Sequence, residues 1–197
     1  MAISFQYNKT SLQNLEKNLK MRVRTLPTLK NKESALRMEV KRAKDEIERL
    51  ENEVEQRIKA YDRMIALWGE FDTSLISVKD VNMSVRKIAG VRVPVLDEVV
   101  FDIKPFSVFD SPKWFADGLT QLKELAQVSI EREFSARKVQ LLEYARKKTT
   151  QKVNLFEKVQ IPGYEDAIRK IKRFMEDEEN LSKSSQKIVK AKREAQS

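Results

Sequence analysis

Apolar residues recur every three or four positions over two long stretches of this chain, one near each end. This spacing is the a/d pattern of a coiled coil, in which a helix buries one apolar stripe against a partner. The N-terminal stripe comprises Leu12, Leu15, Leu19, Leu26, Leu29, Leu36, Val40, Ala43, Ile47, Leu50, Val54, Ile58, Tyr61, Ile65 and Trp68. The C-terminal stripe comprises Leu119, Leu122, Ala126, Ile130, Phe134, Leu141, Ala145, Val153, Phe156, Val159, Tyr164, Ala167, Ile171, Phe174, Leu181 and Ile188.

Two such stripes predict a mainly α fold, in which the N- and C-terminal helices form a long antiparallel two-helix coiled coil. An ordinary helical bundle is the alternative. We expect the first helix within residues 1–75, a small middle region at 76–118 and the return helix within 119–197. Pro162 is expected to break the return helix, because proline cannot donate a backbone hydrogen bond. Antiparallel pairing would place Pro27 of the first helix near the same level.

Two polar pairs are typical of helix starts. Thr10 and Gln13 have the spacing of a capping box, which satisfies free backbone N–H groups at a helix N-terminus. Ser111 followed by Pro112 has the N-cap and N1 residues of a second start. We therefore predict that the first helix begins near Thr10 and that a short helix follows Pro112.

The middle of the chain is rich in β-branched and aromatic residues. Between residues 88 and 104 apolar and polar residues alternate, which predicts a β-hairpin. We expect one strand with Val91, Val93 and Val95, a turn at Asp97-Glu98, and a second strand with Val99, Phe101 and Ile103. A lone two-stranded hairpin is marginal in water, so this hairpin should lie on the helices or on a partner.

Composition removes many kinds of site. The chain has no cysteine and no histidine, which excludes Cys/His zinc clusters, disulfides and catalytic triads built on histidine. Its four glycines lie far apart, so no glycine-rich loop can hold a phosphate. We predict no catalytic residue, no metal site and no cofactor. No apolar run approaches the ~20 residues of a membrane span, and the start lacks a signal peptide, so a cytoplasmic protein is expected.

Positive charge gathers at both ends of the chain. Residues 1–32 contain seven Lys or Arg against Glu16, and residues 181–197 contain five against Glu194. The total charge is +9, so the residues between are close to neutral. Antiparallel pairing would bring the two basic ends together, and such a field favours an acidic partner, nucleic acid or an anionic membrane. A basic coiled-coil scaffold that binds a membrane surface or nucleic acid is one interpretation, and a merely solvated helix face is another.

Three segments resemble the D subunit of the V/A-type rotary ATPases. The opening NKTSLQNLEKNLKMRVRTLPTLKNKESALRMEV is similar to the family's Leu-rich start, and IAGVRVPV is similar to its Gly-Val-x-Val/Ile-Pro segment. KVNLFEKVQIP resembles its Arg-Val-Asn-Ala-Leu-Glu…Ile-Pro motif. The order of the segments spans nearly the whole chain, and their departures from the family pattern indicate a divergent bacterial branch. The matching motif residues are Val153, Asn154, Glu157, Ile161 and Pro162.

The resemblance implies a non-catalytic central-stalk rotor shaft that couples ATP hydrolysis or synthesis to ion (proton) transport. Its partners would be the F subunit, the catalytic A and B subunits and the socket subunit above the membrane ring. It would sit on the cytoplasmic side of the membrane as a peripheral part of the complex. The tip facing the A/B ring is expected at Lys9, Lys17, Lys20, Arg22, Arg24, Lys187, Lys190 and Arg193. Contacts with the F subunit are expected at Tyr61, Trp68, Leu141 and Tyr144, and membrane-side docking at Val91, Val93, Phe101, Ile103, Trp114 and Phe115.

Overall fold

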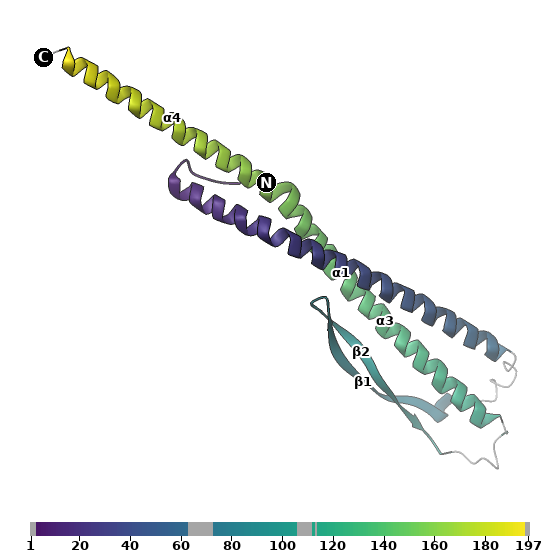
Figure 1. The fold of residues 1–197 in the computed structure, drawn as a ribbon. Coiled ribbons are helices and arrows are strands. Elements are labelled where there is room, and N and C mark those ends of the chain that lie inside the picture. Colours follow the sequence, from purple (N-terminus) through teal and green to yellow (C-terminus); the bar gives the residue numbers. More distant parts are fainter. Residues whose placement is uncertain (1–2, 63–72, 106–111, 113, 196–197) are drawn as a thin grey trace. The chain divides into compact units, whose positions relative to one another are not determined.

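The computed structural model describes residues 3–62, 73–105, 112 and 114–195 (Figure 1). The chain is mainly helical, with an N-terminal helix, a central antiparallel hairpin and a long C-terminal helix, so the predicted fold class is confirmed. The elements are α1 (Lys9–Asp62), η1 (Thr73–Leu75), β1 (Ile76–Ile88), β2 (Val91–Ile103), α3 (Phe115–Leu155), η2 (Phe156–Gln160) and α4 (Ile161–Glu194). η1 is a 3₁₀ turn and η2 is a π-helix.

Two compact units make up the described chain. The first contains the residues up to Glu33 together with those from Lys148 onward, and the second is Ser34–Lys147. α1 and α3 each contribute residues to both units. Each unit therefore contains its own stretch of the paired helices, with its own core.

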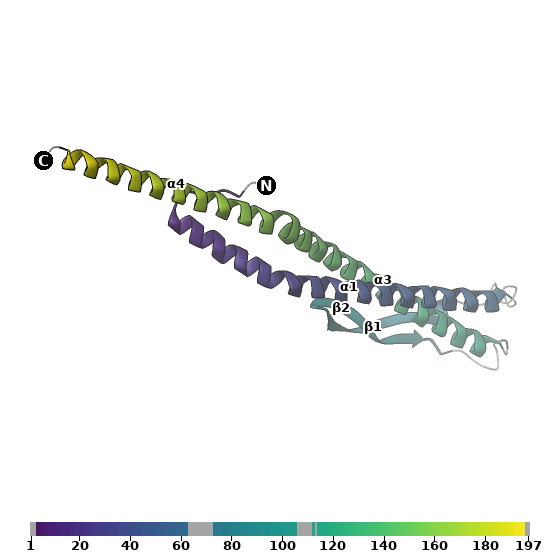
Figure 2. The same cartoon turned by 45° about the horizontal axis from the view of Figure 1, so that its top comes forward.

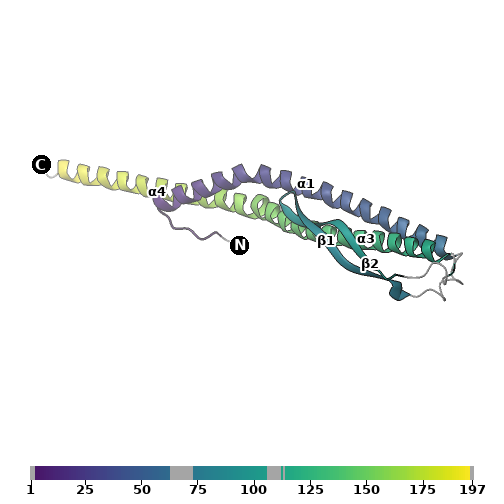
Figure 3. The ribbon, with the colours of Figure 1, turned by 90° about the horizontal axis from the view of Figure 1, so that it is seen from below.

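In the second unit, the hairpin packs on the two helices and shares their core. Leu36 and Val40 of α1 and Leu142 of α3 are buried in one cluster with Val93 of β2. Figure 3 shows the hairpin lying along both helices. Burying an apolar side chain of this size contributes about 1.5–3 kcal/mol, so a hairpin that would be marginal alone is held by this cluster.

The hairpin turn lies at Ala89-Gly90, and the prediction of a turn at Asp97-Glu98 is wrong. β1 pairs with β2 from Ile88 opposite Val91 to Ile76 opposite Ile103. Ala89 and Gly90 have φ values of 47° and 83°, the positive φ that a tight two-residue hairpin requires. The segment expected to form two strands is therefore one strand, β2. Its true partner, β1, lies before the predicted hairpin.

α3 begins at Phe115 and continues into the return helix. The short helix expected after Pro112 is thus the first part of α3, and no separate α-helix precedes α3 among residues 73–105, 112 and 114. The expected N-cap, Ser111, lies outside the described residues. The backbone N–H of Phe115 donates to the carbonyl of Pro112, which satisfies one free group at the helix start.

Ion pairs join α1 to α3 along the second unit. Each pair joins one residue of α1 to one residue of α3 and lies at the edge of the apolar stripe. The pairs are Lys44–Glu143 (2.6 Å), Glu46–Lys138 (3.0 Å), Glu51–Arg132 (2.8 Å) and Arg57–Glu124 (2.9 Å). Exposed pairs of this kind contribute at most about 1 kcal/mol each, so they fix the register of the two helices more than they stabilise them.

In the first unit, α1 is capped by Asn8. The side-chain Oδ1 of Asn8 accepts a hydrogen bond of 2.7 Å from the backbone N–H of Ser11. The predicted capping box at Thr10 and Gln13 is therefore wrong, since the helix already begins at Lys9. Asparagine is at least as good an N-cap as threonine, which explains the earlier start.

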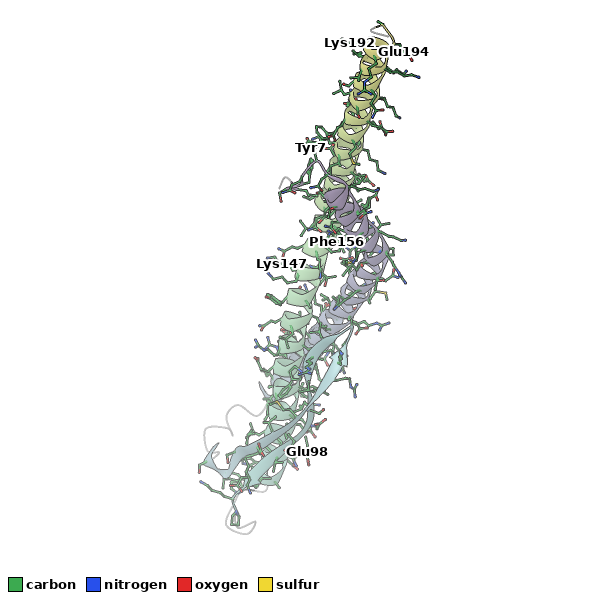
Figure 4. The ribbon with its side chains drawn as sticks, turned by 90° about the vertical axis from the view of Figure 1, so that its left-hand side faces the viewer. Tyr7, Glu98, Lys147, Phe156, Lys192 and Glu194 are labelled. Atoms are coloured by element: carbon green, nitrogen blue, oxygen red, sulfur yellow. The ribbon has the colours of Figure 1, made fainter. Side chains whose placement is uncertain are left out.

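The residues before α1 close the core of the first unit. Leu15 of α1 is buried with Ala167, Ile168 and Ile171 of α4, and Ile3 and Phe5 pack against this cluster. The ring of Tyr7 lies 4.8 Å from that of Phe174 (Figure 4). The N-terminal segment thus ties the start of α1 to the middle of α4.

α4 runs beyond the start of α1. Figures 1 and 2 both show its C-terminal part extending past the first turn of α1 without a neighbour in its unit. Every residue from Glu176 to Ala195 is exposed. We call residues 176–195 the free end of α4.

Candidate interaction surfaces

The described residues do not contain a group of three acidic side chains, histidines or cysteines that could hold a metal ion. Among the described helices, none is both long and apolar enough to cross a membrane. The first candidate surface is the free end of α4.

The free end of α4 carries apolar side chains that no part of its unit covers. Leu181, Ile188 and Val189 are 69%, 58% and 50% exposed. Their spacing of seven or eight residues, with the small Ser185 between them, places them on one side of the helix. An exposed apolar stripe on a helix is typical of a surface that meets a partner.

Basic side chains surround this stripe. Lys187, Lys190 and Arg193 are exposed, and Lys190 lies 3.8 Å from Glu194. Figure 4 shows Lys192 and Glu194 at the far end of the helix, away from the other elements of the unit. The free end thus combines apolar contact area with a positive charge, which favours an acidic or polar partner surface.

The two basic ends of the chain meet only in part. Lys9, Lys17, Lys20 and Arg24 are exposed on α1, as expected for a surface, but they lie where α1 is paired with α4. Arg193 lies nineteen residues beyond Phe174, the residue that contacts Tyr7, which is about 28 Å along a helix. The two basic ends therefore overlap only in part, because α4 is longer than the partner it pairs with. A tip facing the A/B ring stays a prediction.

Arg22, the remaining tip residue, points into the helix pair. Its Nε donates a hydrogen bond of 2.7 Å to Oε1 of Gln160. Its guanidinium lies 5.6 Å from the ring centre of Phe156 and 4.9 Å from that of Tyr164 (Figure 4 labels Phe156). Arg22 thus serves an internal contact around η2, a role that sequence reasoning missed.

The irregular part of the return helix lies opposite Pro27. Arg22 reaches Gln160, and Lys30 forms a 2.6 Å ion pair with Glu157, so the contacts on either side of Pro27 both end in η2. The expected break at Pro162 takes another form. The helical backbone continues through η2, with helical φ and ψ at both Gln160 and Ile161, and Pro162 is the second residue of α4.

The family-motif residues surround η2 and have different environments. Val153 is buried, and Glu157 pairs with Lys30. Asn154 and Pro162 are exposed, and Ile161 is half-buried. The motif therefore marks the segment in which α3 passes into α4.

Of the residues expected to contact the F subunit, Tyr144 is 65% exposed on α3. Leu141 is half-buried against the core, and the hydroxyl of Tyr61 donates to the carbonyl of Gln121 at 2.9 Å. Burial raises the pKa of Tyr61, in keeping with an internal contact. Trp68 lies outside the described residues.

The residues expected at the docking end divide into buried and open ones. Val93 and Phe115 are buried, and Val91 packs against the core, so these three side chains support the fold. Ile103 is largely exposed. The open apolar residues on β1, Met83 and Val85, are 65% and 66% exposed, and the sequence prediction did not include them.

Aromatic contacts hold the remaining docking candidates. Trp114 lies beside Phe115, with ring centres 5.0 Å apart, and both pack with Leu119 at the start of α3. The ring of Phe101 lies 5.6 Å from Nζ of Lys123. These contacts attach the base of the hairpin to α3.

Comparison with known proteins gives a consistent result. The model of the family described as the D subunit of ATP synthase matches residues 11–191. The V-type ATP synthase D subunit of Borreliella burgdorferi is 32% identical over 187 residues, which cover 93% of this chain and 92% of that protein. The V-type ATP synthase D subunit of Chlamydia trachomatis serovar L2 is 31% identical over 200 residues, covering 98% of this chain and 97% of that protein.

Proposed function

Because the chain belongs to the family of ATP synthase D subunits, we propose that it is the central-stalk rotor shaft of a V/A-type rotary ATPase. In this role it transmits torque between ATP hydrolysis or synthesis in the A/B ring and ion translocation in the membrane ring. The chain itself is non-catalytic, and it is a peripheral part of the complex on the cytoplasmic side. The observation that carries the proposal is a paired helix whose C-terminal end is left free, apolar and basic.

A shaft must resist twisting between its two ends. In the second unit the ion pairs described above join α1 to α3, and in the first unit Lys30–Glu157 and Glu16–Lys172 also join the two sides of the helix pair. When paired helices twist against each other, these contacts and the apolar stripe between them must shift together. The pairing therefore supports a role in carrying torque.

The free end of α4 suits insertion into a ring of subunits. Leu181 and Ile188 offer apolar contact area, while Lys187 and Arg193 offer charge to polar or acidic loops. Exposed charges in water attract only weakly, so the end could turn inside the ring without strong adhesion. This surface is our candidate for the contact with the A and B subunits.

Two further surfaces are candidates for the remaining partners. Tyr144 presents an exposed ring on α3, and we assign it to the F subunit. Ile103 is exposed at the base of the hairpin, opposite Ile76, which packs in one cluster with Trp114, and we assign this region to the socket subunit above the membrane ring. Both assignments predict that alanine at these positions weakens binding of the named partner.

Co-expression of the chain with the F subunit and the A and B subunits tests the proposal. We expect a stable complex with the F subunit that joins the A/B ring in fewer copies than A or B, with altered ATP turnover. Size-exclusion chromatography and an ATPase assay measure both. A chain that binds none of these subunits but binds anionic liposomes or nucleic acid, with affinity that falls steeply as salt rises, would instead be a basic scaffold.

A further inference from the structure

The stripe that faces α1 changes register where α3 passes into α4. Thr149 and Val153 are buried in the first unit. If this alternation of three and four residues continued, the next inward positions would be Phe156, Gln160, Gly163, Ala167 and Lys170. That series would place Lys170 in the core of the first unit.

The small Ala167 of this series is buried, but the larger side chains that face inward come one position later than the series predicts. Tyr164 and Met175 pack against the core cluster, and Ile168 and Ile171 are buried in it. Lys170 is exposed and forms a 2.8 Å ion pair with Asp166. Between Val153 and Tyr164, therefore, the chain contains one residue more than the regular pattern.

η2 accounts for the extra residue. A π-helix closes its hydrogen bonds over five residues where an α-helix uses four, so a single π turn takes up one residue without rotating the helix beyond it. The backbone N–H of Ile161 donates to the carbonyl of Phe156, which is a bond of this kind. The start of α4 therefore keeps its apolar side toward α1 despite the insertion.

In the first unit, the stripe of α1 has no matching irregularity. Leu12, Leu15 and Leu19, then Leu26 and Leu29, keep the same spacing on both sides of Pro27. The extra residue therefore has to be accommodated in the return helix alone. Arg22, between these two groups, occupies an inward position of the same series and reaches the side chains of Phe156, Gln160 and Tyr164 across the pair.

We propose that η2 is a one-residue register correction, held by Arg22, that turns the apolar side of α4 toward α1. It thereby sets which side of α4 its free end presents to a partner. The inference depends on the packing of the first unit alone and stands whether or not the proposed function is correct.

A single deletion in the full-length chain tests the correction. Val159 is exposed within η2, and its removal should convert η2 into regular α-helix with α4 still in register. The melting temperature should then stay within a few degrees of that of the parent. The matched control removes Arg169, an exposed residue of regular α4, and should lower the melting temperature by about 10 °C because buried isoleucine leaves the core.

Cross-linking reads the register directly, since the chain has no cysteine of its own. Glu16 and Lys172 face each other at 2.8 Å in the parent. A short bismaleimide should link the cysteine of Glu16→Cys to that of Lys172→Cys, both in the parent and in the Val159 deletion. In either background it should link Glu16→Cys to Arg173→Cys only poorly. If the Val159 deletion moved the link to Arg173→Cys, or melted as low as the Arg169 deletion, the proposal would be overturned.

Arg22 is tested by combining substitutions. Arg22→Met should lower the melting temperature of the parent by several degrees, yet have little effect in the Val159 deletion, where no π turn remains to be held. Equal losses in the two backgrounds would show that Arg22 stabilises the helix pair generally and does not hold the π turn. The bismaleimide pattern of Arg22→Met, compared with that of the parent, shows whether the register has slipped.

Discussion

Leu142 lies where three elements meet. It is fully buried in one cluster with Leu36 of α1 and Val93 of β2, so it supports both the helix pair and the hairpin. Close packing leaves little room for neighbours to collapse into a gap, and the cost of a cavity adds to the lost burial. A single side chain thus connects the stability of the hairpin to that of the helices.

Leu142→Ala should lower the free energy of unfolding by about 2–5 kcal/mol. Met38→Ala is the matched control, because Met38 belongs to the same unit and is 57% exposed. It should change the free energy by less than about 0.5 kcal/mol. Urea unfolding followed by circular dichroism measures both, and similar losses for the two variants would contradict the assigned core.

On the free end of α4, the hydrogen bond from Lys183 lowers the pKa of the Glu179 carboxyl below its ordinary value of 4.5. A depressed pKa means that the ion pair stabilises the helix above that ordinary value and is lost as the pH falls through the lower one. An NMR titration should therefore find Glu179 below 4.5. Lys183→Gln should raise its pKa toward the ordinary value, and an unchanged pKa in that variant would rule out the assigned pair.

At the scale of elements, the hairpin turn depends on one glycine. Gly90 has a φ of 83° and is exposed, so a side chain there meets backbone strain and no packing conflict. Gly90→Ala should destabilise the second unit by about 1 kcal/mol. Gly90→Asn should cost less, because asparagine tolerates positive φ. Thermal unfolding compares the two, and an alanine variant as stable as the asparagine variant would contradict this turn.

The helices could be predicted from sequence because their spacing directly encodes burial. Leu36, Val40 and Leu50 all fall on the predicted stripe, and all are buried. The hairpin turn could not be located as safely. Asp97-Glu98 and Ala89-Gly90 both lie beside apolar residues, and the glycine that allows positive φ is the signal that distinguishes the true turn.

The contacts of Arg22 show another limit of sequence reasoning. From sequence alone, a cation among the apolar stripe positions indicates either a weakly packed position or part of a charged surface. The role of Arg22 depends on its contacts with Gln160 and Tyr164, which lie far away in the chain. A signal was present, since Lys170 falls on the inward series that starts at Val153, and a mismatch of this kind indicates an inserted residue.

For the molecule as a whole, folding and assembly should be separable. The residues of the free end make no contact with the core of their unit, so a chain that stops after Asn180 should keep its stability to within about 0.5 kcal/mol. Under the proposed function it should still bind the F subunit but no longer join the A/B ring. Calorimetry measures the stability of the shortened chain, and co-purification measures its binding to the F, A and B subunits. A large loss of stability would show that the free end supports the fold.

The free end of α4 should also differ in protease sensitivity between assembled and unassembled copies of the protein. Outside a complex, residues 176–195 offer lysine or arginine at every few positions on a helix that nothing in its unit holds, and such helix ends open locally at little cost. A protease that cleaves after basic residues should therefore trim this end before any other part of the described chain. Once a partner encloses the helix, the same bonds are out of reach, so unassembled copies would be degraded while assembled ones survive.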